Sequence, residues 1–244
     1  MSLASLREGY RALVFGASGG VGGALVGALA ADARCAVVHA AARRPQPTGP
    51  KVVPHAFALE DEASIAACVA AAAADGPIDL VIVATGLLHD EAMQPEKTWR
   101  ALDADALARA FAVNAIGPAL VAKHALGHLP REGKAVFAVL SARVGSIADN
   151  RLGGWHAYRA SKAALNMLVK TLAIELARRN GEAVCVSLHP GTVDTALSAP
   201  FQSSRRDGLF TPDESAAHLL RVIDGLNGED SGGLFAWDGQ AIPF

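Results

Sequence analysis

Cysteine is scarce in this chain and follows no metal-binding or disulfide pattern. The 244 residues include three cysteines, Cys35, Cys68 and Cys185, which are widely spaced and form no Cys-x-x-Cys pair. An odd number at such spacings argues against a disulfide framework and against a zinc site. We therefore expect no bound metal, and three reduced cysteines favour a cytoplasmic location.

An excess of charge of either sign is also missing. Lysine and arginine number 22, aspartate and glutamate number 24, and the formal net charge is −2. A nucleic-acid-binding domain, or a protein held on an anionic lipid surface, would carry a basic bias. The composition therefore predicts neither nucleic acid nor a membrane as a partner.

The chain lacks a long uninterrupted apolar run, although one segment resembles such a run. No charged residue lies between Ala12 and Ala31, and Arg7 and Arg11 precede this segment. Six glycines interrupt it, whereas a membrane-spanning helix or a secretory leader should be continuous. We expect the glycines to have another purpose.

Aromatic residues are few, at 5%, yet hydrophobic residues make up 51% of the chain and can fill a large aliphatic core. Apolar runs alternate regularly with helix-forming segments. This order predicts an α/β fold with parallel strands and helices on both faces of the sheet. The strands are expected within residues 11–17, 35–41, 51–59, 78–86, 134–141, 183–191 and 232–237, and the helices within 22–32, 62–76, 103–129, 155–181 and 212–226.

The segments between these elements contain no linker long enough to divide the chain, so residues 1–244 are expected to form one domain. Gly117-Pro118 lies inside the third predicted helix and predicts a kink there. The longest polar loop, residues 198–211, follows the sixth strand. Ligands of open α/β sheets bind beyond the carboxyl ends of the strands, which makes this loop a candidate substrate lid.

The glycines of the N-terminal apolar segment join the first strand to the first helix. Gly16, Gly20 and Gly22 are spaced G-x-x-x-G-x-G. Small residues in such a loop let the backbone approach a pyrophosphate, and the helix N-terminus favours its negative charge. The spacing differs from the general G-x-G-x-x-G form, and glycines also make tight turns between strands and helices. The position after the first strand favours dinucleotide binding.

The residues after the second strand bear on the choice of dinucleotide. An acid there would bind the ribose 2′-hydroxyl and repel a 2′-phosphate. The sequence has His39-Ala-Ala-Ala-Arg43-Arg44 instead, with no acid. Arg43 or Arg44 could pair with a phosphate through its guanidinium, or either could be a solvated loop residue. We predict NADP rather than NAD, with Arg43 as the phosphate ligand.

A tyrosine and a lysine form the most informative pair, because the chain has only two tyrosines. Tyr158 and Lys162 are four residues apart near the start of a predicted helix and therefore share one face. They could be an ordinary surface pair. Alternatively, an ammonium beside a phenol lowers the phenol pKa, and such a phenol can donate a proton to a carbonyl oxygen as hydride reaches the carbon.

With these residues the chain resembles the short-chain dehydrogenase/reductase family over nearly its full length. The matching pieces, in order, are GASGGVG after the first strand, ATG at residues 84–86, VNAIG around Asn114, YRASK at residues 158–162 and HPGTVDT at residues 189–195. Residues 145–167 and the terminal AWDGQAIPF resemble the sub-group of C-factor-like and Sniffer-like carbonyl reductases. The resemblance implies a Rossmann-type doubly wound parallel sheet of seven strands, in the order 3-2-1-4-5-6-7, with helices on both faces. It also implies a small carbonyl or alcohol substrate.

The resemblance also implies a role for each matching residue. Tyr158 would be the general acid/base, and Lys162 would lower its pKa and bind the nicotinamide ribose. Asn114 would hold a water that relays protons to Lys162, or would only satisfy backbone groups near Gly117-Pro118. Thr195 would contact the cofactor, or would cap a helix. The implied cofactor-binding residues are Gly16, Ser18, Gly20, Val21, Gly22, Arg43, Leu59, Ala84, Gly86, Tyr158, Lys162, Pro190, Gly191 and Val193.

The sequence departs from the family pattern near the adenine. The family usually has Asn-Asn-Ala-Gly where this chain has Val83, Ala84, Thr85 and Gly86. An aspartate common after the third strand is replaced by Ala58. We therefore expect adenine to be held more by shape and backbone than by side chains.

The family's third catalytic group, a serine at the end of the fifth strand, is displaced. Relatives read Ser-Ser-x-x-Gly with the second serine catalytic, and alignment on Gly145 puts Ala142 there and Ser141 one residue early. One step along a strand reverses the side chain. Three alternatives follow: Ser141 supplies the hydroxyl through a local shift or bulge, Ser146 or Arg143 substitutes, or the site works without a serine. Ser141 is our predicted catalytic residue.

Two functions compete at this stage. The first is an NAD(P)-dependent oxidoreductase acting on a small carbonyl or alcohol. The second is a dinucleotide-binding signalling or scaffold protein with weak or lost catalysis, which the displaced serine favours. Outer apolar positions such as Leu168, Leu172 and Leu176 are either core or a subunit contact, and we expect a homodimer or homotetramer.

Overall fold

The computed structural model describes residues 2–45, 49–91, 93–201 and 208–244. The predicted fold class is confirmed: the main sheet has seven parallel strands in the order β3-β2-β1-β4-β5-β6-β9. Its last strand carries the label β9 because the short strands β7 and β8 form a separate pair. The strands are β1 Tyr10–Phe15, β2 Cys35–Ala42, β3 Val52–Ala56, β4 Leu80–Val83, β5 Val136–Leu140, β6 Val184–His189, β7 Thr192–Val193, β8 Leu209–Phe210 and β9 Leu234–Ala236.

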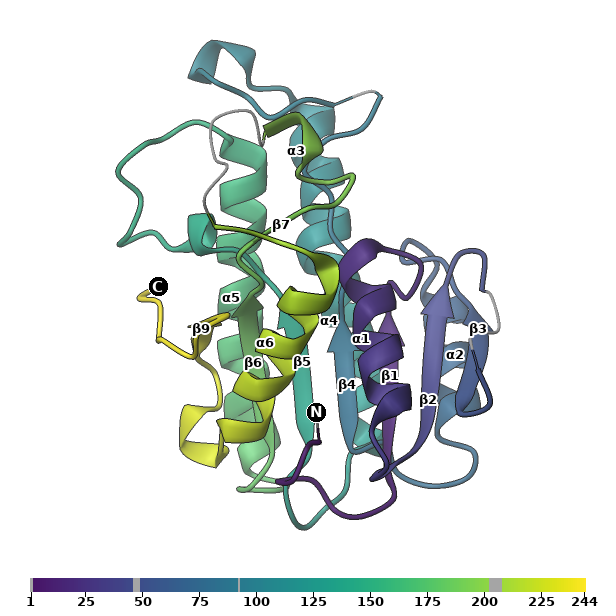
Figure 1. Cartoon of the computed structure of the whole chain (residues 1–244). Coiled ribbons are helices and arrows are strands. Elements are labelled where there is room, and N and C mark those ends of the chain that lie inside the picture. Colours follow the sequence, from purple (N-terminus) through teal and green to yellow (C-terminus); the bar gives the residue numbers. More distant parts are fainter. Residues whose placement is uncertain (1, 46–48, 92, 202–207) are drawn as a thin grey trace.

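The helices cover both faces of the sheet (Figure 1). They are α1 Gly20–Ala31, α2 Glu62–Ala72, α3 Ala104–Phe111, α4 Gly117–Ala125, α5 His156–Ala177 and α6 Pro212–Gly225. Helices α1 and α6 pack with each other on one face, and α2, α4 and α5 pack on the other. Strand β5 serves both cores: Ala138 and Leu140 lie in the first, Phe137 and Val139 in the second.

The third predicted helix is interrupted, but by a different device from the one expected. Residues Ala112–Ile116 form a π-helical turn between α3 and α4, and Pro118 lies in the first turn of α4. Ile116 and Gly117 are both in the αR conformation, so Pro118 lies inside a continuous helical run and lacks the N–H of one helical hydrogen bond. The irregularity next to it is the π turn, which contains Asn114.

One described helical stretch, residues 104–128, is long and apolar enough to cross a membrane by length and composition alone. In this structure Val121, Ala122 and Ala125 of α4 are buried in the core against the sheet. That packing is how a core helix of an α/β domain behaves. We therefore keep the prediction that no membrane is a partner.

The outer face of α5 resolves part of the question about subunit contacts. Leu176 is a core residue, and Leu168 and Leu172 pack against the same core. Met167 and Ile174, in contrast, are 68% and 52% exposed. Homo-oligomerisation stays a prediction, with these two side chains rather than the leucines as candidate contacts.

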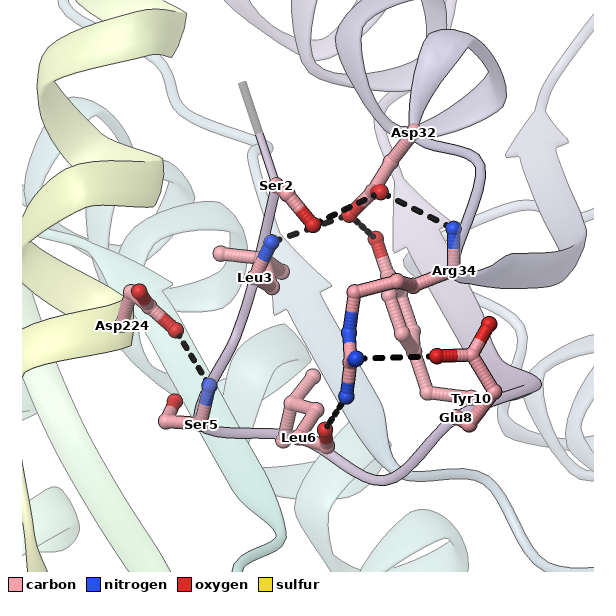
Figure 2. A network of polar contacts seen from close by, with 9 residues as sticks. All are labelled: Ser2, Leu3, Ser5, Leu6, Glu8, Tyr10, Asp32, Arg34 and Asp224. Atoms are coloured by element: carbon pink, nitrogen blue, oxygen red, sulfur yellow. Dashed lines mark hydrogen bonds and ion pairs between the residues drawn. The ribbon is translucent and has the colours of Figure 1, made fainter.

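A network around Asp32 ties the N-terminal segment to the amino ends of the strands (Figure 2). Its carboxylate accepts hydrogen bonds from the hydroxyls of Ser2 and Tyr10 and from the backbone N–H of Leu3 and Arg34. Burial alone would raise the pKa of Asp32, but these donors lower it overall. Tyr10, one of the two tyrosines, is thus a buried anchor whose own pKa is raised, chiefly by burial.

A buried histidine makes the stability of this fold depend on pH. His39 of β2 is 4% exposed, with Nδ1 2.8 Å from Nε2 of His55 and Nε2 3.2 Å from Nη2 of Arg11. Burial, followed by the charges of His55 and Arg11, lowers its pKa from 6.5 to about 4. Between these pH values the unfolded chain binds a proton that the folded chain excludes, so stability falls as the pH falls.

We expect the wild type to lose about 2 kcal/mol of unfolding free energy at His39 between pH 7 and pH 5. Urea unfolding at the two pH values measures it. His39→Gln should lose correspondingly less, whereas His128→Gln, which changes an exposed histidine, should match the wild type. Equal losses in all three proteins would assign the acid sensitivity to other groups.

Candidate active site

The glycine loop between β1 and α1 is closely packed by backbone. Gly16 has φ +86°, and a Cβ there would lie 2.9 Å from the carbonyl carbon of Ala84. A Cβ on Gly22 would lie 2.1 Å from the carbonyl oxygen of Gly16. Only glycine fits either position. The loop therefore brings the end of β4 and the start of α1 together at the carboxyl edge of the sheet.

The N-terminus of α1 is open to a ligand. Gly19 is its N-cap and makes no side-chain cap hydrogen bond, and Ser18 and Gly20 are exposed. A Cβ on Gly20 would lie 2.7 Å from Cγ2 of Thr195, so the segment after β7 closes over this loop. Unpaired N–H groups at a helix N-terminus suit a pyrophosphate.

The segment after β4 adds a second feature that fits a dinucleotide. Ala84 and Gly86 flank Thr85, whose Oγ1 is buried and has no hydrogen-bond partner among the described residues. A buried hydroxyl without a partner costs free energy unless a ligand or water satisfies it. The closely packed glycines and this hydroxyl together fit a nicotinamide dinucleotide.

The residues expected on the adenine side occupy different environments. Arg43 and Arg44 are both exposed at the end of β2, as a phosphate ligand there requires. Leu59 is 8% exposed, and a Cβ on Gly117 would lie 2.4 Å from its Cγ. The side chain of Leu59 therefore packs on α4, and its contact with the cofactor stays a prediction.

The segment after β6 forms a tight turn at Gly191, and its contact with the nicotinamide stays a prediction. Gly191 has φ +80°, and a Cβ there would lie 2.7 Å from the ring of Phe210. The carbonyl of Pro190 accepts a hydrogen bond from Ser215 of α6 at 2.9 Å, and Val193 is buried in β7. The turn is thus fixed by α6 and by the small β7–β8 pair, which sequence analysis did not predict.

Asn114 is fully buried and well satisfied. Its Oδ1 accepts from the backbone N–H of Leu87 at 2.8 Å, and its Nδ2 donates to the carbonyl of Leu87 at 2.8 Å and to Oγ of Ser161 at 3.1 Å. The side chain therefore joins the π turn to the segment after β4 and to α5. This arrangement matches the alternative in which Asn114 only satisfies backbone groups, although these groups belong to Leu87 and not to residues near Gly117-Pro118. The water relay stays a prediction.

Lys162 lies beside these groups on α5. A Cβ on Gly86 would be 3.8 Å from Oδ1 of Asn114 and 3.9 Å from Nζ of Lys162. The side chains of Asn114 and Lys162 therefore both lie next to Gly86. Nζ donates to the carbonyl of Leu140 at 2.7 Å, at the end of β5. Burial lowers the pKa of Lys162 to about 7. Near neutral pH the ammonium thus holds its proton weakly.

Tyr158 is partly buried, one turn before Lys162. The Lys162 Nζ lies 5.8 Å from the centroid of its ring. Burial raises the pKa of the Tyr158 phenol to about 12. This direction is opposite to the expected effect of the lysine, because the penalty of burying a phenolate outweighs an amine that donates to Leu140.

The hydroxyl of Ser141 has a partner on α5. The β5–β6 ladder is regular up to the pair Leu140 and Leu188, and the N–H of Ser141 continues it to the carbonyl of Leu188. The Ser141 hydroxyl donates to Oδ1 of Asn166 on α5 at 2.8 Å, and both residues are buried. The bulge that would re-aim this serine is not seen in β5, and its catalytic role stays a prediction.

The two substitutes for the serine also have partners. Ser146 accepts from the backbone N–H of Asp149 at 3.0 Å, and Arg143 forms an ion pair of 3.1 Å with the Asp149 carboxylate. The ion pair is half exposed and lies within the chain, not between subunits. Ala142, at the position of the family's serine, has extended backbone and is 8% exposed.

Sequence analysis expected residues 87–102 to shape the pocket but did not predict the aromatic contacts around Tyr158. Trp155 lies 6.3 Å from Tyr158 and 5.2 Å from Phe201, measured between ring centroids, and His89 lies 5.5 Å from Phe201. Apolar side chains also pack closely around Tyr158, among them Leu87, Leu88, Met93 and Pro95, and the gap between them has no room for a water molecule. These residues lie in irregular segments, whose mutual placement no periodic pattern reveals. Residues 202–207 of the predicted lid lie outside the described residues.

The open helix N-terminus, the glycine loop and the tyrosine–lysine pair define an enzyme of the dinucleotide-dependent oxidoreductase class. Residues 10–206 match the family model of the short chain dehydrogenases. The chain belongs to the short-chain dehydrogenase/reductase family, as its motifs predicted.

Three relatives show how the similarity is distributed. C-signal of Myxococcus xanthus is 38% identical over 172 residues, which are 69% of this chain and 94% of that protein. A carbonyl reductase from Pseudomonas aeruginosa is 29% identical with a TM-score of 0.78, covering 96% of this chain and 100% of that one. The NADPH-bound carbonyl reductase from chicken fatty liver is 24% identical, covers 98% and 96%, and shares the fold with a TM-score of 0.82.

Proposed function

We propose that this enzyme uses NADPH to reduce a small carbonyl compound, with Tyr158 as the general acid. The observation that carries the proposal is the placement of Tyr158 and Lys162 on one turn of α5, with Lys162 beside Gly86 and Asn114. Among relatives, the Pseudomonas protein is named a carbonyl reductase and the chicken structure contains NADPH.

The protonation state of Tyr158 suits the role of an acid. With its pKa raised to about 12, Tyr158 is protonated at neutral pH and can donate to a carbonyl oxygen.

In the proposed reaction the nicotinamide, when bound, supplies the hydride. Tyr158 gives its proton to the carbonyl oxygen, and Lys162 binds the ribose and stabilises the phenolate that remains. The π turn at Asn114 fixes the segment after β4 beside Lys162. NADPH consumption across a panel of aldehydes, ketones and quinones tests the assignment, and cofactor binding without turnover on any member would refute it.

The second candidate is a dinucleotide-binding signalling protein with weak catalysis. One observation favours it: Ala142 replaces the catalytic serine, and the hydroxyl of Ser141 is bonded to Asn166. The relative named C-signal is consistent with it. The same panel of carbonyl compounds separates the two functions.

The preference for NADPH is expected to depend on Arg43. Replacing it with alanine should weaken NADPH binding by about 10-fold or more and leave NADH binding almost unchanged, because a guanidinium–phosphate bond is charge-assisted. Fluorescence titration with each cofactor measures the ratio. Arg44→Ala tests the neighbouring alternative, and Arg178→Ala, an exposed arginine after α5, is the control. Equal affinity of the wild type for both cofactors would contradict the prediction.

A further inference from the structure

We infer that Glu96 is a positioning residue that fixes the first turn of α5, and with it the phenol of Tyr158. The inference rests on the proposed function of Tyr158. Glu96 lies in the irregular segment after β4 and is 6% exposed. Both of its carboxylate oxygens lie 3.3 Å from the backbone nitrogen of Ala157, the second residue of α5, which donates to them.

The helix that carries the active site does not cap itself. The N-cap residue of α5 is Trp155, which makes no side-chain cap hydrogen bond. The carboxylate of Glu96, 61 positions earlier in the chain, takes over this role for the N–H of Ala157. The backbone carbonyl of Glu96 also accepts a hydrogen bond from the N–H of Trp155. One residue of the segment after β4 therefore holds both the N-cap residue and the first turn of α5.

The backbone at this point is strained and needs such support. Trp155 has φ 53° and ψ 43°, the left-handed conformation, and is the one described non-glycine residue with positive φ. Gly153 and Gly154 before it have φ 63° and 66°. A bulky residue keeps this conformation only where its surroundings impose it. The bonds to Glu96 are the contacts that do so at Trp155 and Ala157.

The bonds from Glu96 to Trp155 and Ala157 join the segment after β4 to the helix that carries Tyr158. Tyr158 directly follows Ala157, so a shift of the first turn moves its hydroxyl. Leu88, Met93 and Pro95 of the segment that holds Glu96 line the same narrow gap as Tyr158. Glu96 thus fixes how this segment and the phenol of Tyr158 lie relative to each other.

Replacement of Glu96 separates its hydrogen bond from its charge. We expect Glu96→Ala to lower kcat by about 10- to 100-fold, the effect of a small misplacement of a catalytic group, with the affinity for NADPH unchanged. Glu96→Gln keeps an acceptor oxygen and loses only the charge at the helix N-terminus, so its kcat should stay within about fivefold of the wild type. Glu91→Ala, an exposed acid of the same segment, is the matched control.

Global destabilisation would weaken NADPH binding together with turnover, which distinguishes it from misplacement of Tyr158. If Glu96→Ala does not fold, Glu96→Asp takes its place in the test, because a side chain one methylene shorter cannot reach the N–H of Ala157. The Asp variant should show the same loss of kcat at unchanged NADPH affinity. Wild-type turnover in the folded Ala or Asp variant, or equal losses for Gln and Ala, would overturn the inference. If Tyr158→Phe kept full activity, the proposed function itself would fail instead.

Discussion

Replacing Tyr158 with phenylalanine should lower the kcat for carbonyl reduction by about 10³-fold, which is the usual contribution of a positioned general acid. The change removes one oxygen and leaves the ring, so the contact with Trp155 and the packing of α5 remain. The affinity for NADPH should change little. Steady-state consumption of NADPH gives kcat, and fluorescence titration gives the cofactor affinity.

The second tyrosine of the chain supplies a matched control. Tyr10→Phe also removes one buried hydroxyl, but that hydroxyl donates to Asp32 at the amino ends of the strands, away from the site (Figure 2). We expect this variant to unfold more easily by about 1–3 kcal/mol, with kcat unchanged. Undiminished turnover in Tyr158→Phe would remove Tyr158 from the chemistry and leave the fold assignment intact.

Regular patterns in the sequence were enough to predict the sheet and half of the site. The alternation of apolar runs with helices predicts parallel strands, and the family resemblance supplies their order. The glycine spacing marks the tight turn at Gly16, where an added Cβ would lie 2.9 Å from the carbonyl carbon of Ala84. Tyr158 and Lys162 share one helix, so their spacing alone places them together. Such relations lie within one element or at one strand end, where a short stretch of sequence contains all the information.

The features that sequence analysis missed depend on contacts between distant segments. Glu96 caps α5 from an irregular segment, and no pattern pairs an acid with a helix that starts 60 positions later. The π turn at Asn114 depends on the backbone of Leu87. The raised pKa of Tyr158 depends on burial, which the spacing of a lysine does not reveal. Each of these features needs three-dimensional placement, as sites under strain commonly do.

The displaced serine leads to the second large effect, a gain of activity in Ala142→Ser. Ala142 has φ −149° and ψ 146°, extended backbone that serine adopts without strain, and Gly145 follows it as in relatives with the catalytic serine. A hydroxyl there would give the substrate oxygen a second donor beside Tyr158. We expect kcat/KM to rise on the order of 10-fold. This is less than the effect of a preorganised hydrogen-bond donor, because the residues around Ala142 do not hold a new hydroxyl in place.

Ser141→Ala should act in the opposite way. Its hydroxyl donates to Asn166, whose Nδ2 already has no partner among the described residues, so the loss should destabilise the fold by about 1–3 kcal/mol. Turnover by the folded fraction should stay within about threefold, because a group bonded to α5 is not the carbonyl donor. Unfolding curves and kcat/KM for both single variants and the double variant separate the two effects. The prediction fails if Ser141→Ala is folded but inactive while Ala142→Ser gains nothing; Ser141 would then be the donor, re-aimed when the substrate binds.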